Sequence, residues 1–307
     1  MASDKPIIAI TGPTASGKTR LAVGVARNID AEIISADSRQ VYRRMDIGTG
    51  KDIEEYGEVP YHLIDICEPG EKYNLFRFLN HCNQAMEQIR RRGRRIVICG
   101  GTGMYVEAAI NGLQMPRVDP DPQLRERLGH LSLQELTAML ATMKTLHNTT
   151  DVDTPQRAIR AIEIETYYRD HPEARPVPPP PCHKPKAVVV ATLMDRDTRR
   201  SLITRRLHRR LENGMEQEVR DLLAAGLKPD DLIYYGLEYK WLTLAVTGRI
   251  TRQEMIEQLE IAIHRFAKRQ MTWIRGMERR GHTVNYVPYD IDPMELTSLI
   301  SQWEKRL

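Results

Sequence analysis

With 307 residues, 41% of them hydrophobic and 28% charged, and a formal net charge of +4, the chain has the composition of an ordinary globular protein with room for one large core and an additional unit. No secretory signal pattern begins the sequence and no apolar run approaches a membrane span, so we expect a cytoplasmic protein without membrane contact. The cysteines lack C-x-x-C spacing, which indicates free thiols rather than a disulfide or metal framework: Cys67, Cys82, Cys99 and Cys182.

The first predicted strand, Ile7–Ile10, is followed by a segment that fits the phosphate-loop pattern G-x-x-x-x-G-K-[ST]. Gly12 and Gly17 let the backbone curl so that several N–H groups point at phosphate oxygens. Lys18 supplies a positive charge, Thr19 can hold a Mg²⁺ ion through its hydroxyl, and the following helix adds positive potential. We therefore predict a diphosphate or nucleotide site formed by Gly12, Pro13, Thr14, Ala15, Ser16, Gly17, Lys18 and Thr19.

Short apolar segments then alternate with helical patterns, which is typical of an α/β fold with a largely parallel sheet. The amphipathic segment Phe76–Arg92 ends at Gly93, as expected of a crossover helix. We predict a P-loop NTPase-like core in which helices flank a mostly parallel sheet. Its first strands are Ile7–Ile10, Glu32–Ser35, Tyr61–Asp65 and Ile96–Cys99.

From Leu113 the alternation stops, and prolines mark an exit from the core. Gln123–Met143 has the leucine spacing of helices, and a further amphipathic helix spans Thr154–Tyr168, with Thr154 as its cap and Pro155 at its first position. The proline-rich stretch 176–185 is typical of a stiff extended connector, although an SH3-type ligand is an alternative. We predict a helical insertion at 113–185 between the two parts of the core, 1–112 and 186–307.

After the insertion, a helix from Asp197 to about Ala225 carries an apolar stripe. Arg206 and Arg210 border this stripe, and a basic residue at the margin of a buried face can reach into a cleft. The remaining predicted elements are two strands and a long helix: Ala187–Leu193, Val284–Tyr286 and, for the helix, about Arg252 to Glu278.

Three loops leave the carboxyl ends of predicted strands, where ligands bind in open α/β sheets. They are the phosphate loop, Asp37–Gln40 and Gly100–Gly103. Asp37 would lie near the phosphates as a Mg²⁺ ligand, as a general base or only as the cap of a following helix. The Thr102 hydroxyl could donate to a leaving oxygen, or its glycine-rich loop could be a simple tight turn.

Basic residues are unevenly distributed, with clusters at Arg90–Arg95, Arg199–Arg210 and Arg265–Arg280. Any one such cluster is most often a solvated helix face. Three of them in a phosphate-binding protein favour a polyanionic partner such as RNA.

Five motifs, in this order and over nearly the whole chain, resemble those of the bacterial tRNA dimethylallyltransferases, also called tRNA isopentenyltransferases. DSRQVY and AKRQ-TW are the most specific of them. The motifs are GPTASGKT (Gly12–Thr19), DSRQVYRRMDIGTGK (Asp37–Lys51), GGTGMYVEAAINGL (Gly100–Leu113), QRAIRAIE (Gln156–Glu163) and FAKRQMTWIRG (Phe266–Gly276).

The resemblance implies transfer of a dimethylallyl group from dimethylallyl diphosphate to N6 of the adenosine 3′-adjacent to the anticodon, in tRNAs that read codons starting with U. It implies Asp37 as the base, Thr102 and Arg206 as further catalytic groups, and Mg²⁺ on Thr19. The helical insertion would bind the anticodon arm, and we expect a monomer. The implied tRNA-binding residues are Asp37, Ser38, Arg39, Gln40, Gln156, Arg157, Ala158, Ile159 and Arg160.

Four segments depart from the usual family sequence, one of them the stretch 143–150 before Asp151 in the insertion. Gly50-Lys51-Asp52 stands where the family usually has an alanine and a proline around GTAKP. Leu202-Ile203 replaces an Arg-Ile pair, and Gly236–Lys240 replaces the usual Gly-Tyr-Lys-Glu segment. The alternatives are an adenylate prenyltransferase, a small-molecule phosphate-loop kinase, or a non-catalytic RNA-binding protein with a relic phosphate loop.

Overall fold

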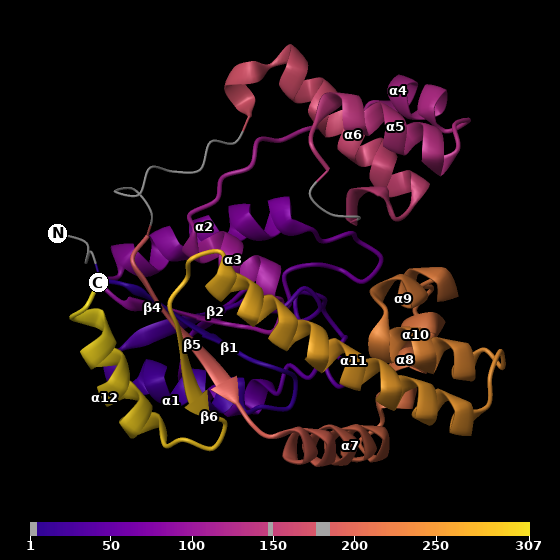
Figure 1. The fold of residues 1–307 in the computed structure, drawn as a ribbon. Coiled ribbons are helices and arrows are strands. Elements are labelled where there is room, and N and C mark those ends of the chain that lie inside the picture. The colour runs from indigo at the N-terminus through magenta and orange to yellow at the C-terminus, as the bar shows by residue number, and fades with distance from the viewer. Residues whose placement is uncertain (1–4, 147–149, 176–184) are drawn as a thin grey trace. The chain divides into compact units, whose positions relative to one another are not determined.

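The computed structural model describes residues 5–146, 150–175 and 185–307 (Figure 1). The chain divides into two compact units, a larger one formed by Met1–Leu113 with Pro179–Leu307 and a smaller one formed by Gln114–Pro178. Each unit has a hydrophobic core of its own. The proline-rich segment predicted as a connector lies, except for Pro185, outside the described residues, as does Cys182. The three described cysteines are free thiols: Cys67, Cys82 and Cys99.

The larger unit is built on one sheet of six parallel strands, in the order β3-β2-β4-β1-β5-β6, which confirms the predicted parallel α/β fold. β3 is shorter than predicted because Leu63 and Asp65 adopt positive φ angles of 66° and 56°, which a strand cannot contain. The strands are β1 (Ile7–Thr11), β2 (Ala31–Ser35), β3 (Tyr61–His62), β4 (Arg95–Cys99), β5 (Ala187–Leu193) and β6 (Val284–Pro288).

Helices cover both faces of the sheet, as Figure 1 shows. β1 and β5 are buried on both sides, so their sequences are nearly continuous apolar runs rather than alternating ones. β2 is equally buried but includes the charged Glu32. One face packs against α1 (Lys18–Ile29) and α12 (Pro293–Glu304). The other face carries α2 (Leu75–Arg91), α3 (Gly103–Ile110) and α11 (Arg252–Arg279).

The region after β5 differs from the prediction. The single helix expected from Asp197 to Ala225 is two helices, α7 (Arg196–Glu212) and α8 (Met215–Ala224). Gly214 between them has a φ of 94°, a left-handed conformation that ends α7 and turns the chain. Two further helices, α9 (Pro229–Tyr235) and α10 (Leu237–Val246), were not predicted; α10 packs against α8, α9 and α11.

The described residues of the smaller unit form three α-helices: α4 (Pro122–Leu128), α5 (Leu133–Met143) and α6 (Pro155–Asp170). Side-chain caps begin all three, from Asp121, from a Ser132–Glu135 capping box and from the predicted Thr154 cap with Pro155 after it. Leucines and small residues form their shared core: Leu124, Leu128, Leu136, Leu140, Ala158, Ala161 and Ile162.

Among the described residues, no helix combines the length and the apolar character that crossing a membrane requires.

Candidate active site

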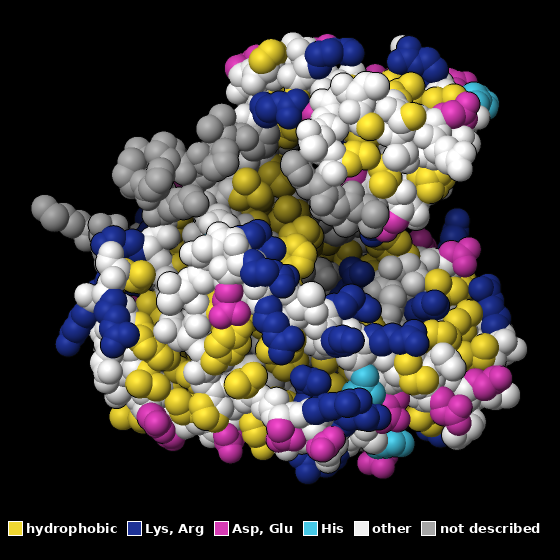
Figure 2. All heavy atoms as spheres, in the orientation of Figure 1, with side chains coloured by type: hydrophobic (Ala, Val, Ile, Leu, Met, Phe, Trp, Pro, Cys, Tyr) yellow, Lys and Arg dark blue, Asp and Glu magenta, His cyan; other side chains and the backbone are white. Residues whose placement is uncertain are grey.

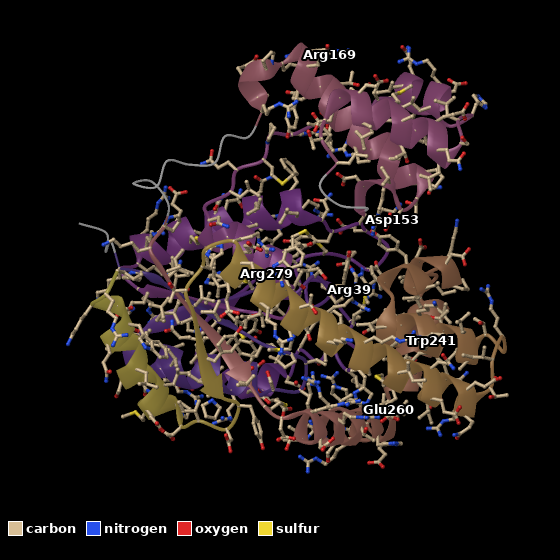
Figure 3. The ribbon with its side chains drawn as sticks, viewed as in Figure 1. Arg39, Asp153, Arg169, Trp241, Glu260 and Arg279 are labelled. Atoms are coloured by element: carbon tan, nitrogen blue, oxygen red, sulfur yellow. The ribbon has the colours of Figure 1, made fainter. Side chains whose placement is uncertain are left out.

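A cavity of about 740 Å³ lies in the larger unit at the carboxyl ends of β1, β2 and β4. The three loops predicted to lie at this edge of the sheet all line it. α7, α10, α11, the end of α9 and residues of the segment 48–56 contribute its other walls. Arg39, after β2, and Trp241, on α10, are labelled in Figure 3. The predicted site residues that line the cavity are Thr14, Ala15, Ser16, Gly17, Lys18, Thr19, Asp37, Ser38, Arg39, Gln40, Thr102 and Arg206.

The phosphate loop has close backbone approaches that require glycine. A Cβ on Gly12 would lie 1.9 Å from the Thr192 hydroxyl oxygen, which donates to Ser16 Oγ at 2.7 Å. Gly17, with a φ of 66°, begins α1. The Lys18 ammonium donates to the Pro13 carbonyl at 2.7 Å, and burial lowers the pKa of Lys18 to about 8. The loop therefore holds a cation that an anionic ligand would stabilise.

Gln270 on α11 joins the phosphate loop to the glycine-rich loop. Its side-chain oxygen accepts from the Thr14 N–H at 2.8 Å, and its side-chain nitrogen donates to the Gly101 carbonyl at 2.9 Å. Gln270 is buried, 6% exposed, so both halves of its amide are used to fix two walls of the cavity. Gln270 is a site residue that was not predicted, although a polar residue inside the AKRQ motif, on the buried face of a helix, was a usable signal.

Asp37 does not cap a helix, so that alternative is wrong. Its Oδ1 accepts from the backbone N–H groups of Arg39 and Gln40 at 2.8 and 3.4 Å, within a turn. The turn fixes the carboxylate at the cavity wall. Thr102 lies beside this turn, where its hydroxyl oxygen accepts from the Ser38 N–H at 3.2 Å.

Two of the other predicted residues in this turn make contacts within the protein. The Arg39 Nε donates to the Tyr235 carbonyl at 2.8 Å, and its guanidinium lies 5.5 Å from the centre of the Tyr235 ring. The Gln40 side chain accepts from Ser35 Oγ at 2.9 Å and donates to the Gly50 carbonyl at 3.0 Å. These side chains therefore help to hold the loop that follows β2.

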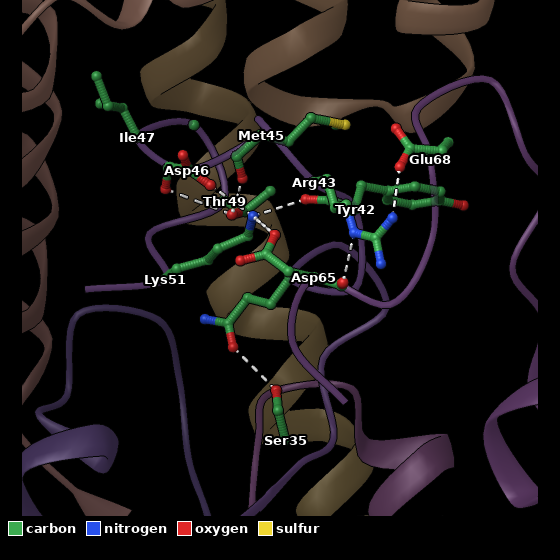
Figure 4. A network of polar contacts seen from close by, with 12 residues as sticks. Ser35, Tyr42, Arg43, Met45, Asp46, Ile47, Thr49, Lys51, Asp65 and Glu68 are labelled. Atoms are coloured by element: carbon green, nitrogen blue, oxygen red, sulfur yellow. Dashed lines mark hydrogen bonds and ion pairs between the residues drawn. The ribbon is translucent and has the colours of Figure 1, made fainter. Parts of the chain in front are cut away.

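Lys51 holds the same loop together from inside (Figure 4). Its ammonium is 1% exposed and donates to the Tyr42 carbonyl at 2.6 Å, to Asp46 Oδ1 at 2.5 Å and to Asp65 Oδ1. From α8, the Glu218 carboxylate accepts from three consecutive backbone N–H groups, those of residues 46–48, at 2.7, 2.7 and 3.0 Å. Glu218 and Lys51 therefore fix the two ends of the segment 46–51, whose residues 48–50 line the cavity.

Replacing Lys51 by methionine should lower the free energy of unfolding by about 2–3 kcal/mol, because two carboxylates and a carbonyl lose their shared donor. The estimate lies below the about 3–5 kcal/mol typical of a broken buried ion pair because Asp46 and Asp65 reach solvent. Arg43→Gln, which removes an exposed ion pair with Glu68 on the same loop, should cost less than about 1 kcal/mol. Equal losses in urea denaturation would contradict the structural role of Lys51.

Comparison with known proteins now places the chain. A family model described as IPP transferase matches residues 40–277, and one described as isopentenyl transferase matches residues 5–58. The chain belongs to the IPP transferase family. Among its relatives, tRNA dimethylallyltransferase 1 of Parabacteroides distasonis is 54% identical over 92% of each chain. tRNA dimethylallyltransferase 2 of Bacteroides fragilis is 53% identical over 97% of this chain and 98% of its own.

Two solved structures are also similar to this chain. The crystal structure of a tRNA isopentenylpyrophosphate transferase from Bacillus halodurans is 31% identical, with a TM-score of 0.71, and the match covers 98% of this chain and 97% of that one. A eukaryotic dimethylallyltransferase shares the fold, with a TM-score of 0.75 at 22% identity, covering 98% of this chain and 76% of its own.

Within this IPP transferase, only part of the basic character faces the cavity. Figure 2 shows Lys and Arg side chains gathered over α7 and α11. Six arginines of these two helices line the cavity: Arg205, Arg206, Arg209, Arg210, Arg265 and Arg269. The cluster Arg90–Arg95 leads into the amino end of β4, away from the cavity, and Arg92 and Arg95 pair with Glu32 and Glu304.

In the smaller unit, the predicted tRNA-binding residues have different surroundings. Gln156 and Arg157 are exposed, and Arg157 pairs with Asp153 at 2.6 Å. Arg160 donates to the buried Glu163 carboxylate and to the Val118 carbonyl. The Ala158 side chain is buried in the core of this unit, and the partly buried Ile159 side chain packs against that core.

Proposed function

We propose that this chain is a tRNA dimethylallyltransferase. It transfers the dimethylallyl group of dimethylallyl diphosphate to N6 of the adenosine 3′-adjacent to the anticodon (position thirty-seven), in tRNAs that read codons starting with U. The products are N6-isopentenyladenosine and diphosphate. The observation that carries the proposal is the meeting of a phosphate loop and the Asp37 carboxylate in one cavity, in a chain that belongs to the IPP transferase family.

The reaction needs a proton acceptor and stabilisation of the leaving group. The N6 lone pair attacks C1 of the dimethylallyl group, the C1–O bond breaks with its electron pair going to diphosphate, and the N6 proton goes to Asp37. The backbone turn that binds Oδ1 keeps the Asp37 carboxylate in place for this role. An adenine in the anticodon loop must leave its stack to reach the cavity, as in base flipping.

The diphosphate would lie against the phosphate loop. Backbone N–H groups of the loop, the Lys18 ammonium and the Arg206 guanidinium are donors for its oxygens, and Arg206 Nη1 already lies 3.4 Å from Thr14 Oγ1. The Thr102 hydroxyl, on the opposite loop, adds a further donor. These donors stabilise the charge that grows on the leaving oxygen as the C1–O bond breaks.

The cavity also fits a Mg²⁺ ion. Thr19 and Asp37 both line it, and Mg²⁺ is commonly bound by one or two protein oxygens together with substrate phosphates and water. Among the described residues, no group of three or more His, Cys, Asp and Glu side chains could hold a metal alone, so diphosphate would supply much of the coordination. The ion would neutralise charge on the departing diphosphate.

The partners follow from this reaction. tRNA would lie along the basic surface of α7 and α11 and against the exposed Gln156 and Arg157 of the smaller unit. A monomeric state and a cytoplasmic location stay predictions of the sequence.

The decisive experiment is single-turnover transfer of labelled dimethylallyl from its diphosphate to total tRNA, with AMP and ATP as competing acceptors. Label in tRNA, at the adenosine 3′ of the anticodon and dependent on Mg²⁺, is the expected result. Label in AMP or ATP would instead identify an adenylate prenyltransferase. Failure to label any acceptor would contradict the proposal.

Replacing Arg206 by alanine should lower the transfer rate by about 10²-fold or more, because one donor to the developing negative charge is lost. The melting temperature should change little, since Arg206 is only half-buried and its contacts are long, 3.4 Å to Thr14 and 3.7 Å to Asp52. A large fall in melting temperature with normal transfer at low temperature would show that Arg206 is a structural residue.

A further inference from the structure

Arg210 is a second arginine of α7 that lines the same part of the cavity as Arg206. Arg210 is one helical turn further along, at the spacing that puts both side chains on one face. It is 9% exposed, and its buried Nη2 has no hydrogen-bond partner among the described residues. The Asp52 carboxylate lies 3.7 Å from this atom, beyond hydrogen-bonding distance. A buried guanidinium nitrogen without a hydrogen bond is costly and calls for an explanation.

Gly50 makes the room for this guanidinium. A Cβ built on Gly50 would lie 1.4 Å from Nη2 of Arg210 and 2.2 Å from Nη2 of Arg206. The two guanidinium groups therefore converge above one backbone position that has no side chain. Gly50 is one of the residues that depart from the usual family motif, where an alanine would occupy the space that Arg210 now fills.

The two arginines form an incomplete anion site. Asp52 lies 3.7 Å from each Nη2 and hydrogen-bonds to neither. The Glu238 carboxylate, which lines the same small pocket, also attracts Arg210, so the two like charges are partly compensated. Burial, and next the charge of Arg206, lower the pKa of Arg210 to about 10, so Arg210 is still a cation at neutral pH. An anion bound between the two groups would satisfy the unused donor and reduce their repulsion.

The phosphate loop is the neighbour of this pair. Arg206 contacts Thr14 of the loop, and Arg210 lines a small pocket together with Thr14 and Ala15 as well as the main cavity. Because the phosphate loop is the proposed diphosphate site, the anion that would bind beside these arginines is the diphosphate of the prenyl donor.

We infer that Arg210 is a second diphosphate-binding arginine, whose Nη2 donates to a phosphate oxygen beside Arg206. The inference rests on the proposed function, because it takes the diphosphate of that reaction as the ligand. Gly50 is the residue that admits the second guanidinium, and Glu238 and Asp52 offset part of its charge when diphosphate is absent. Two guanidinium groups, rather than one, therefore bind the leaving diphosphate.

The test compares the affinity of the full chain for inorganic diphosphate with Mg²⁺, measured by calorimetry, in the wild type and in Arg210→Met. Methionine keeps an unbranched side chain but has no donor, and we expect about 10- to 100-fold weaker binding, the usual cost of a lost charge-assisted hydrogen bond. Arg200→Met is the matched control. It removes the same charge from an exposed position of α7 outside the cavity lining, and should change the affinity less than about twofold.

A folded Arg210→Met protein with wild-type affinity for diphosphate would overturn the inference. Should that variant fail to fold, Gly50→Ala carries the test, because its methyl group would displace the Arg210 guanidinium, at 1.4 Å, more than that of Arg206, at 2.2 Å, without removing either. Gly50 has a φ of 61°, so a melting curve must first show that the alanine variant is folded. Unchanged affinity in folded Gly50→Ala would overturn the inference equally. Loss of affinity in folded Gly50→Ala is the expected result. Where Arg210→Met does fold, adding it to Gly50→Ala should cause little further loss.

The inference and the proposed function can fail separately. If the wild type transfers dimethylallyl to tRNA while Arg210→Met binds diphosphate normally, only the role of Arg210 is wrong. If the wild type labels AMP instead of tRNA, the acceptor is wrong, and the effect of Arg210→Met on diphosphate affinity still decides the inference.

Discussion

Replacing Asp37 by asparagine should lower the single-turnover rate of dimethylallyl transfer by about 10²- to 10⁴-fold, the range expected when a general base is lost. Asparagine keeps a side-chain carbonyl that can accept from the N–H groups of Arg39 and Gln40, as Asp37 does at 2.8 and 3.4 Å. The turn should therefore persist, and the affinity for tRNA should change little. The rate is measured with saturating labelled dimethylallyl diphosphate and tRNA, and tRNA binding is measured separately.

Asp37→Ala separates the two roles of this side chain. It removes the proton acceptor, so its rate of dimethylallyl transfer should be below that of the wild type. It also removes the acceptor of two backbone N–H groups, so its free energy of unfolding should be about 1 kcal/mol lower than that of Asp37→Asn. Should Asp37→Asn transfer dimethylallyl at the wild-type rate, Asp37 is not the base and serves only the turn.

Replacing Lys18 by methionine should lower kcat/KM for dimethylallyl diphosphate by about 10²- to 10³-fold, the usual loss when one preorganised donor to a developing charge is removed. The folded state should tolerate the change. Lys18 donates only to the Pro13 carbonyl in the described contacts, and burial already disfavours its charged form. A variant that keeps its melting temperature and its kcat/KM would contradict the assignment of Lys18 to the diphosphate.

The pH dependence of binding gives an independent test of Lys18. Its pKa is about 8 in the ligand-free protein, against an ordinary value of 10.5, so it is charged below pH 8 and loses its proton as the pH rises above that value. Diphosphate favours the charged form, so the affinity of the wild type should fall above pH 8, by at most about tenfold per pH unit. Measurements should stay below about pH 9.5, because the pKa of Arg210 is about 10.

The Lys18→Met variant should bind diphosphate weakly at every pH, and its affinity should not decline between pH 8 and 9.5. If the variant kept the wild-type decline, the titrating group would be another residue, and the lowered pKa of Lys18 would have no part in ligand binding.

Most of the core fold could be predicted from the sequence because its signals are local. The strand, the phosphate loop and the helix after it are formed by consecutive residues, so the motif alone predicts their order. An apolar run such as that of β1 indicates a buried parallel strand. Prediction was weaker where the backbone turns within a helical pattern. Asn213-Gly214 divides one amphipathic segment into α7 and α8, and α9 and α10 are short helices held by packing against their neighbours.

By itself, the sequence determined the chemistry available to this protein: a phosphate loop, a carboxylate after the second strand, and arginines on a helix that follows the fifth. Only the tertiary structure decided what each side chain does. Gln270 binds Thr14 from 256 residues away, and Arg210 reaches the cavity because Gly50 leaves a space in a distant loop. The physical reason is that a buried polar group takes its role from its partners, and here those partners come from segments far apart in the chain.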